Sequence, residues 1–369
     1  MSENCSRNGN FGAGRGYLPI VIALLFAACS SEPPPDFNEE AWLASVKATD
    51  ISKLYANHYN EEEKTFFNPW MPRAEQEESG GRHRRSWFFR KKPEYPPWPE
   101  ERYTWKENDY SYLARKDFDS ISFAGHSSLI IKMDGETIFT DPFFSDRAAV
   151  LSKDVKIKFD YSRVPQRPVI LICHNHYDHL DKQSVKALIK KNAVFIVPLK
   201  LKSYLESWGA KEVYELDWWE SISLGSVKYT FLPAQHWSMR IASGQGNSKS
   251  LWGGWLIEGS KTIYFSGDTG YFRGFEEFGS KYKIDYAIMG AGSYAPRWFM
   301  HYQHMNPEEF IRAAGDLGAK ISIPMHFGVI SLSDEPVNYP LYVLDEFIKN
   351  NPEYAERIRL LRVGEYLKI

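Results

Sequence analysis

The feature that most constrains the fold is a short run of metal-ligand side chains directly after an apolar strand. Residues Val169–Cys173 read Val-Ile-Leu-Ile-Cys, which is typical of a buried strand, and His-Asn-His-Tyr-Asp-His follows at once. Imidazole and carboxylate are the donors that zinc takes in catalytic sites, where one position stays open for water. A single histidine is usually structural, but three at this spacing indicate a metal site. The candidate ligands are His174, His176, Asp178 and His179.

Around this run, short apolar strands alternate with amphipathic helices, separated by glycine and proline turns. The predicted strands are Leu129–Met133, Thr137–Thr140, Val169–Cys173, Val194–Val197, Tyr229–Leu232, Leu251–Ile257, Thr262–Ser266 and Ile321–Pro324. The predicted helices are Lys182–Lys191, Leu199–Trp208, Pro307–Leu317 and Leu341–Asn350. This alternation predicts an α/β or layered mixed fold and argues against a helix bundle and an all-β barrel.

Composition limits the class of partner. A chain of 369 residues with 43% hydrophobic content is long and apolar enough for a sizeable core. Lys plus Arg number 45 against 47 Asp plus Glu, so no overall positive charge recruits nucleic acid, and we expect no nucleic-acid partner. The 15% aromatic content supplies side chains for an apolar groove or a membrane interface. The oligomeric state stays open, with a homodimer among the alternatives.

An apolar run near the N-terminus is typical of an export signal. Residues Tyr17–Ala28 follow two arginines, are too short to span a bilayer as a helix, and end in alanines directly before Cys29. This ending resembles the lipobox of bacterial lipoproteins, which predicts residues 1–29 as a signal peptide with a lipidated Cys29. An ordinary signal peptide, or a start codon placed too early, would leave Cys29 incidental. The lipoprotein alternative predicts a membrane-anchored protein on the periplasmic side, with the outer membrane as one destination.

An extension, residues 37–115, precedes the predicted hydrolase domain at 116–369. Residues 30–36 are predicted as a linker, because consecutive prolines neither continue a helix nor pair in a sheet. A helix is predicted over Asp36–Tyr59, and the remaining extension is predicted to wrap irregularly over the core. Segment 81–92 interleaves basic and aromatic residues. That mixture suits an anionic lipid surface and, equally well, a solvated loop.

Three downstream segments complete a known pattern. His-x-His-x-Asp-His is the signature of the metallo-β-lactamase superfamily, and this chain resembles that superfamily again around His236, Asp268 and His326. These residues lie in Pro-Ala-Gln-His-Trp-Ser, Ser-Gly-Asp-Thr-Gly and Pro-Met-His-Phe-Gly. The resemblance implies a four-layer αββα sandwich of the α/β class, with the metal site on one edge of its paired sheets.

The resemblance also implies how the ligands are shared. The first metal would take three imidazoles, those of His174, His176 and His236. The second would take one carboxylate and two imidazoles, those of Asp178, His179 and His326. Asp268 would bridge two Zn²⁺ ions, which would hold the attacking hydroxide, so that Asp178 and Asp268 also count as catalytic residues. Asp141 resembles a carboxylate that supports the ligand loop, and His126 resembles a histidine of the site wall.

Blocks that bind no metal extend the resemblance to the N-acylphosphatidylethanolamine-hydrolysing phospholipases D, from Phe66 to the C-terminus. They are Phe67–Trp70, Asp141–Ser145, Glu215–Glu220, Leu251–Gly253 and Tyr294–Met300. The resemblance implies a membrane phospholipid substrate, cleaved to phosphatidate and an N-acylethanolamine. His304 resembles a histidine near that family's active site and is a candidate for protonating the leaving group or binding phosphate, with a structural role as the alternative. Further candidates for substrate binding are Trp218, Trp219, Tyr294 and Arg297; core packing is the alternative for the two tryptophans.

Two other functions stay open at this point. The same ligands serve hydrolases of phosphorylated lactones, small esters and other phosphodiesters, and the ligand pattern alone does not separate them. A non-catalytic lipoprotein that uses the fold as a binding surface is disfavoured, because every ligand position is occupied.

Overall fold

The computed structural model describes residues 37–72, 92–115, 118–240 and 247–369, all of which belong to one compact unit, Pro34–Ile369. The predicted signal peptide with Cys29, the linker and most of segment 81–92 lie outside the described residues, and they stay predictions. Among the described helices, none has the length and apolar character needed to cross a membrane.

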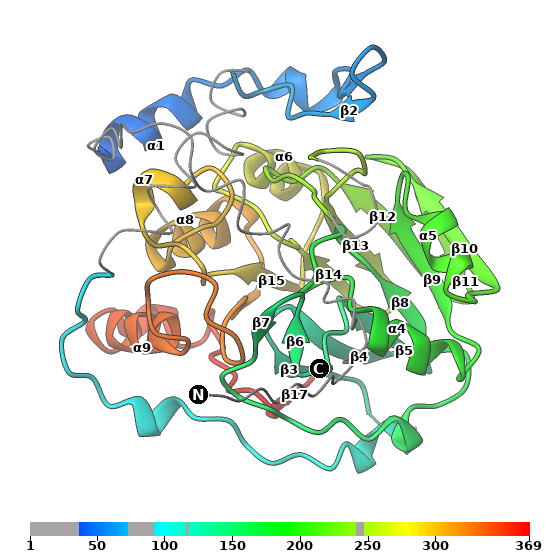
Figure 1. Cartoon of the computed structure of the whole chain (residues 1–369). Helices are drawn as coiled ribbons and strands as arrows, with labels where there is room; N and C mark the ends of the chain where they lie inside the picture. The colour runs from blue at the N-terminus through cyan, green and yellow to red at the C-terminus, as the bar shows by residue number, and fades with distance from the viewer. Residues whose placement is uncertain (1–36, 73–91, 116–117, 241–246) are drawn as a thin grey trace, which may run out of the picture. The chain divides into compact units, whose positions relative to one another are not determined.

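Two large β-sheets form the middle of the described fold (Figure 1). In spatial order, the first contains β10 (Glu212–Leu216), β9 (Val194–Pro198), β8 (Val169–Leu171), β5 (Glu136–Thr140), β4 (Ser128–Met133), β3 (Ser120–Gly125) and β17 (Tyr366–Lys368). The second contains β11 (Ser221–Leu224), β12 (Val227–Leu232), β13 (Gly254–Glu258), β14 (Thr262–Phe265), β15 (Tyr286–Gly290) and β16 (Ile321–Met325). Strands β5, β8, β9 and β10 run parallel, as do β14, β15 and β16, whereas the other neighbours are antiparallel.

Alternation along β4 shows how the first sheet is buried on both faces. Leu129 and Ile131 belong to the large core shared with the second sheet, whereas Ile130 belongs to the core beneath the helices on the opposite face. All three side chains are fully buried, as expected where successive strand residues point to opposite faces of a covered sheet.

Helices cover the outer face of each sheet. Over the first sheet lie α4 (Lys182–Ile189) and α5 (Lys202–Ser207), whose apolar residues join its outer core. Over the second sheet lie α6 (Gly274–Lys281), α8 (Pro307–Leu317) and α9 (Tyr339–Asn350). Helices α6 and α8 approach so closely that a Cβ at Gly279 would lie 2.3 Å from the backbone oxygen of Asp316. These layers confirm the predicted αββα sandwich.

The N-terminal extension is less helical than predicted. Helix α1 covers Glu39–Lys47, with Asn38 capping its first turn, and Asp36 lies outside the described residues. The chain then changes direction at Asp50, whose carboxylate accepts a hydrogen bond from Ser52 N and starts a separate 3₁₀ helix. The remaining short elements of the extension are η1 (Ile51–Tyr55), β1 (Tyr59–Asn60), β2 (Thr65–Phe66), η3 (Glu100–Tyr103) and η4 (Ser111–Ala114).

Every strand and helix predicted within the hydrolase domain is present, with ends shifted by at most three residues. Short elements complete the domain: β6 (Arg147–Ala148), β7 (Leu151–Ser152), η5 (Tyr161–Arg163), α7 (Arg297–Met300) and η7 (Pro352–Tyr354). Strands β3, β10, β11, β15 and β17 and helix α6 were not predicted from the sequence. Helix α6 was hidden because Gly274 and Gly279 weaken its helical signal, although both glycines allow close packing.

Candidate metal centre

The predicted ligands all follow the carboxyl ends of strands, at one edge of the two sheets. The first ligand run follows β8, His236 follows β12, Asp268 follows β14 and His326 follows β16 directly. A pair of backbone hydrogen bonds joins the sheets here: His126 N donates to Phe327 O, and His326 N donates to His126 O, both at 2.8 Å. The centre therefore forms where the two sheets meet.

Hydrogen bonds to its backbone carbonyls stabilise the turn that carries the first ligands. Leu180 N donates to His176 O at 2.8 Å, which closes the turn. The buried guanidinium of Arg240 donates to two carbonyl oxygens of the same turn, Asn175 O at 3.0 Å and Leu180 O at 2.8 Å. Arg240 was not a predicted site residue, because nothing in the sequence around it indicates which backbone it contacts.

Three imidazoles form the first group of converging donors. His174 Nε2 lies 2.6 Å from His176 Nδ1, and His236 Nε2 lies 3.3 Å from the same atom. His174 and His236 are buried, whereas His176 is partly exposed. Together with Asp268, these residues offer four donor atoms that lie within 4.8 Å of one another.

The second group combines a carboxylate with two imidazoles. Asp178 Oδ2 lies 3.3 Å from His179 Nε2 and 3.9 Å from His326 Nε2. Asp268 reaches both groups: its Oδ2 lies 3.0 Å from His179 Nε2 and 3.8 Å from His174 Nε2, and its Oδ1 lies 3.0 Å from His326 Nε2. The structure thus brings all seven predicted ligands together, with Asp268 between the two groups.

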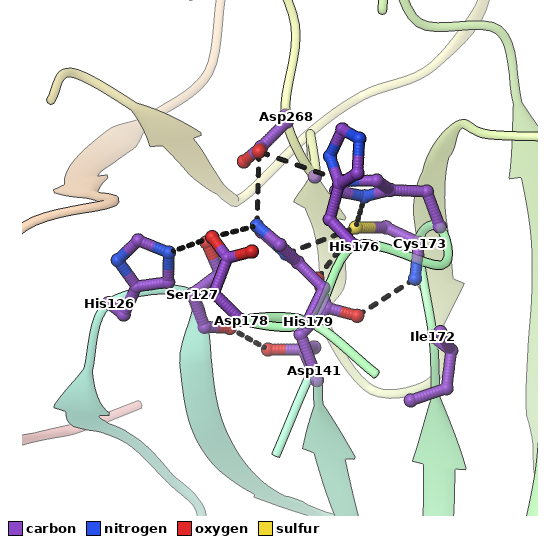
Figure 2. A network of polar contacts seen from close by, with 12 residues as sticks. His126, Ser127, Asp141, Ile172, Cys173, His176, Asp178, His179 and Asp268 are labelled. Atoms are coloured by element: carbon purple, nitrogen blue, oxygen red, sulfur yellow. Dashed lines mark hydrogen bonds and ion pairs between the residues drawn. The ribbon is translucent and has the colours of Figure 1, made fainter. Parts of the chain in front are cut away.

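Buried neighbours orient these ligands from behind (Figure 2). His179 Nδ1 donates to Asp141 Oδ2 at 2.8 Å, and the same carboxylate accepts hydrogen bonds from Cys173 N and Cys173 Sγ. On the other side, His126 Nε2 lies 2.7 Å from Asp178 Oδ2. Asp141 therefore lies behind His179, as expected for a supporting carboxylate. His126 approaches more closely than a wall residue would, since it also lies within 4.8 Å of the second group.

Several site residues have a left-handed backbone. The φ angles are 58° at His126, 37° at Asp141 and 70° at His326. Gly267, directly before Asp268, also has a positive φ of 59°, and a Cβ there would lie 2.7 Å from Cys173 Cβ. Glycine is therefore required at this position to let the Asp268 loop approach the first ligand strand.

Burial keeps the first group of imidazoles in the form that binds metal. It lowers the pKa of His176 to about 4, that of His236 to about 3, and that of His174 well below its usual range. Metal ligation requires the neutral imidazole. Burial alone would raise the pKa of Asp268, but His179 and His326 lower it well below its ordinary value, so this carboxylate is ionised.

The unsatisfied atoms of the cluster fit bound cations. His179 Nε2, His326 Nε2 and Asp268 Oδ1 are buried and make no hydrogen bond within the described structure. Buried polar atoms in native proteins nearly always have a partner. Here His179 Nε2 and His326 Nε2 each lie 3.0 Å from an oxygen of Asp268, and 3.3 Å and 3.9 Å from Asp178 Oδ2. Imidazole and carboxylate are suitable donors for a divalent transition metal. The residues present therefore fit a metal centre.

His304 lies beside both ligand groups. Its ring centroid is 4.9 Å from that of His326 and 5.3 Å from that of His236. It also belongs to a cluster with Asp268 and His326 whose ligand atoms lie within 4.8 Å of one another. Its side chain is partly exposed to solvent, so it can contact a molecule that enters the centre.

Among the described contacts, the other four candidates have packing partners. Trp218 is buried and its indole donates to Trp252 O at 2.6 Å, while the Trp219 indole donates to Leu54 O at 3.0 Å. Tyr294 N donates to Glu335 at 3.1 Å, and Arg297 forms ion pairs with Glu39 and Glu309. These contacts agree with the packing alternative for the tryptophans; substrate binding by all four residues stays a prediction.

Comparison with known proteins agrees with this architecture. Residues 136–327, more than half of the chain, match the family model described as the beta-lactamase superfamily domain. An uncharacterized protein of Mycobacterium tuberculosis is 33% identical over 237 residues, which cover 60% of this chain and 62% of that protein. The chain thus spans less than two thirds of that relative's length.

A second relative carries a functional name. The N-acyl-phosphatidylethanolamine-hydrolyzing phospholipase D 1 of Caenorhabditis elegans is 32% identical over 242 residues, which cover 58% of this chain and 67% of that protein. Among solved structures, a metallo hydrolase of Ignicoccus hospitalis superposes with a TM-score of 0.52 at 20% identity, covering 68% of this chain and 98% of that one. The chain therefore belongs to the metallo-β-lactamase superfamily of metal-dependent hydrolases.

Proposed function

We propose that this protein is a zinc-dependent phosphodiesterase of the phospholipase D type, which hydrolyses N-acylphosphatidylethanolamine to phosphatidate and N-acylethanolamine. The observation that carries the proposal is the position of Asp268, whose two oxygens reach both donor groups while His304 lies alongside. The name of the nematode relative supports the choice of substrate.

Each donor group would hold one Zn²⁺ ion, and Asp268 would contact both. Such ions, when bound, polarise phosphate oxygens and lower the pKa of bound water, so that hydroxide is available as the nucleophile at neutral pH. The chain's own residues set the geometry: Asp141 fixes the ring of His179, and Arg240 fixes the backbone of the ligand turn. In the reaction, the oxygen of water forms a bond to phosphorus, and the bond between phosphorus and the hydroxyl oxygen of the N-acylethanolamine breaks. One proton of the water passes to that leaving oxygen.

His304 has the position of a phosphate ligand in this reaction. Its imidazole N–H can donate to a phosphate oxygen placed between it and the two metal-binding groups. A donor fixed where negative charge grows stabilises the transition state more than the ground state.

The test is a mass-spectrometric assay of the zinc-loaded full chain, purified in detergent, with N-acylphosphatidylethanolamine as substrate. We expect phosphatidate and N-acylethanolamine in equal amounts, loss of both with a chelator, and recovery on adding zinc. Cleavage of a simple phosphodiester or lactone without release of these products would reject the phospholipid substrate and keep the hydrolase.

A further inference from the structure

The metal ligand His236 is held from two directions, and both supports depend on residues far away in the sequence. Its Nδ1 donates to Gln303 O at 3.2 Å, which leaves Nε2 free to face the other donors. Its backbone carbonyl accepts a hydrogen bond from Asn68 Nδ2, in the N-terminal extension, at 2.9 Å. The position of segment 301–304 therefore affects the ligand His236 as well as His304.

Arg297 fixes that segment. Its Nη1 donates to the backbone carbonyl of His304 at 3.1 Å, and its Nη2 donates to Glu309 Oε1 at 2.7 Å. Arg297 lies at the start of α7 and Glu309 lies in the first turn of α8, so the guanidinium spans the loop that carries His304. A planar guanidinium can make these bonds at once, which a lysine ammonium does less well.

Glu309 is an unusual anchor, because its side chain is fully buried. Oε1 also accepts a hydrogen bond from the Trp42 indole at 2.9 Å, and Oε2 accepts one from Asn306 N at 3.0 Å. Burial raises the pKa of Glu309 to about 7, and Arg297 acts in the opposite direction. Arg297 therefore favours the ionised form of this carboxylate and opposes the effect of burial.

Helix α1 of the extension completes the cluster. Glu39 Oε2 lies 3.4 Å from Arg297 Nε, and Glu39 Oε1 accepts a hydrogen bond from Asn306 Nδ2 at 3.2 Å. The Trp42 ring packs edge-on against His301 and Tyr302, with centroid distances of 4.7 Å and 5.2 Å. Helix α1 therefore contacts the start of segment 301–304 directly, and it reaches the carbonyl of His304 only through Arg297.

We propose that α1 acts as a positioning element of the metal centre. The arginine cluster, defined as Glu39, Trp42, Arg297 and Glu309, fixes segment 301–304 so that Gln303 orients His236 and His304 faces the ligands. The inference rests on the proposed hydrolase centre. It assigns to an extension outside the family's matched residues a part in arranging the active site.

The experiment compares matched substitutions within the extension. Trp42→Phe removes the indole hydrogen bond to Glu309, and Trp98→Phe makes the same change where the ring packs on Tyr339 and Tyr342 instead. Glu39→Gln weakens the contact with Arg297, and Glu40→Gln makes the same charge change on the exposed side of the helix.

Two measurements separate positioning from folding. The first is kcat and KM of the zinc-loaded full chain with bis(4-nitrophenyl) phosphate, a small probe that needs no lipid surface. The second is the visible absorption spectrum of the cobalt-loaded chain, which reports ligand geometry without turnover. We expect Trp42→Phe to lower kcat about tenfold with little change in KM, and to alter the cobalt spectrum, as seen when outer supports of metal ligands are removed. Glu39→Gln should do the same to a smaller extent, and both controls should match the wild type.

Equal kcat values and identical cobalt spectra in Trp42→Phe and Trp98→Phe would overturn the inference. A wild-type chain that cleaves no phosphodiester would instead reject the proposed function. In that case the cobalt spectra alone decide: a change confined to the Trp42 and Glu39 variants supports positioning, and unchanged spectra refute it.

Discussion

Two polar clusters adjoin His304, and they differ in whether their buried atoms have hydrogen-bond partners. In the metal-ligand cluster, buried atoms of His179, His326 and Asp268 make no hydrogen bond within the described structure. In the arginine cluster, Glu309 has protein donors for both carboxylate oxygens. The first cluster fits a cation from outside the chain, whereas the buried carboxylate of the second has all its partners within the protein. The difference indicates a binding role for one and a positioning role for the other.

The largest effect should come from removing the ligand shared by both donor groups. We expect Asp268→Ala to abolish phosphodiester hydrolysis, a loss of more than about a thousandfold, because neither group keeps its common carboxylate. The bound metal per chain, measured by elemental analysis, should fall as well, while the circular dichroism spectrum stays that of the wild type. Near-normal turnover in this variant would contradict the role given to the cluster.

The next largest effect concerns the contribution of the arginine cluster to the free energy of unfolding. Glu309→Ala leaves the Arg297 guanidinium without its buried partner, which should cost about 3–5 kcal/mol of unfolding free energy. Glu308→Ala is the matched control on the same helix: it loses only an exposed pair with Arg312, which contributes at most about 1 kcal/mol. Denaturant unfolding measures both. Similar losses in the two variants would show that the buried cluster has no special weight.

A smaller effect concerns a buried charge that belongs to neither cluster. Lys153 Nζ donates to Phe143 O at 2.6 Å and lies 3.9 Å from the centre of the Phe143 ring. Burial lowers the pKa of Lys153 to about 8 from its usual value of 10.5. Between these values the unfolded chain binds more protons than the folded one, so this group makes stability rise with pH in that window.

Lys153→Met should therefore be more stable than the wild type at neutral pH, by on the order of 1–3 kcal/mol, with a smaller advantage near pH 9.5. Urea unfolding of both proteins at the two pH values gives the comparison. A wild type that is the more stable protein at both would show that the carbonyl and ring contacts compensate for burial of the ammonium.

The two clusters also differ in how far the sequence could predict them. The metal-ligand cluster could be predicted because imidazole and carboxylate side chains at the ends of apolar strands have few other uses. The arginine cluster could not, because Trp42 and Glu309 are 267 positions apart and each residue type is ordinary in its local context. Arg297 illustrates the limit: its predicted substrate contact stays untested, and its ion pairs with Glu39 and Glu309 could not be predicted from the sequence.

The bounds of the helices also differed in how well the sequence predicted them. The helix at Pro307–Leu317 was predicted at its observed bounds, and the structure shows a capping box of Asn306 and Glu309 at its start. The predicted helix through Tyr59 was too long, because the Asp50 turn that interrupts it depends on a side-chain bond to Ser52 that competes with helix formation.

The left-handed backbone conformations of His126, Asp141 and His326 reduce the stability of the fold. Such conformations cost of order 1 kcal/mol for a residue that carries a Cβ, and glycine would relieve most of that cost. Selection for heat resistance alone would thus favour glycine at three positions where a histidine or a carboxylate serves the centre. At these three positions, relief of backbone strain and retention of a side chain at the centre therefore compete.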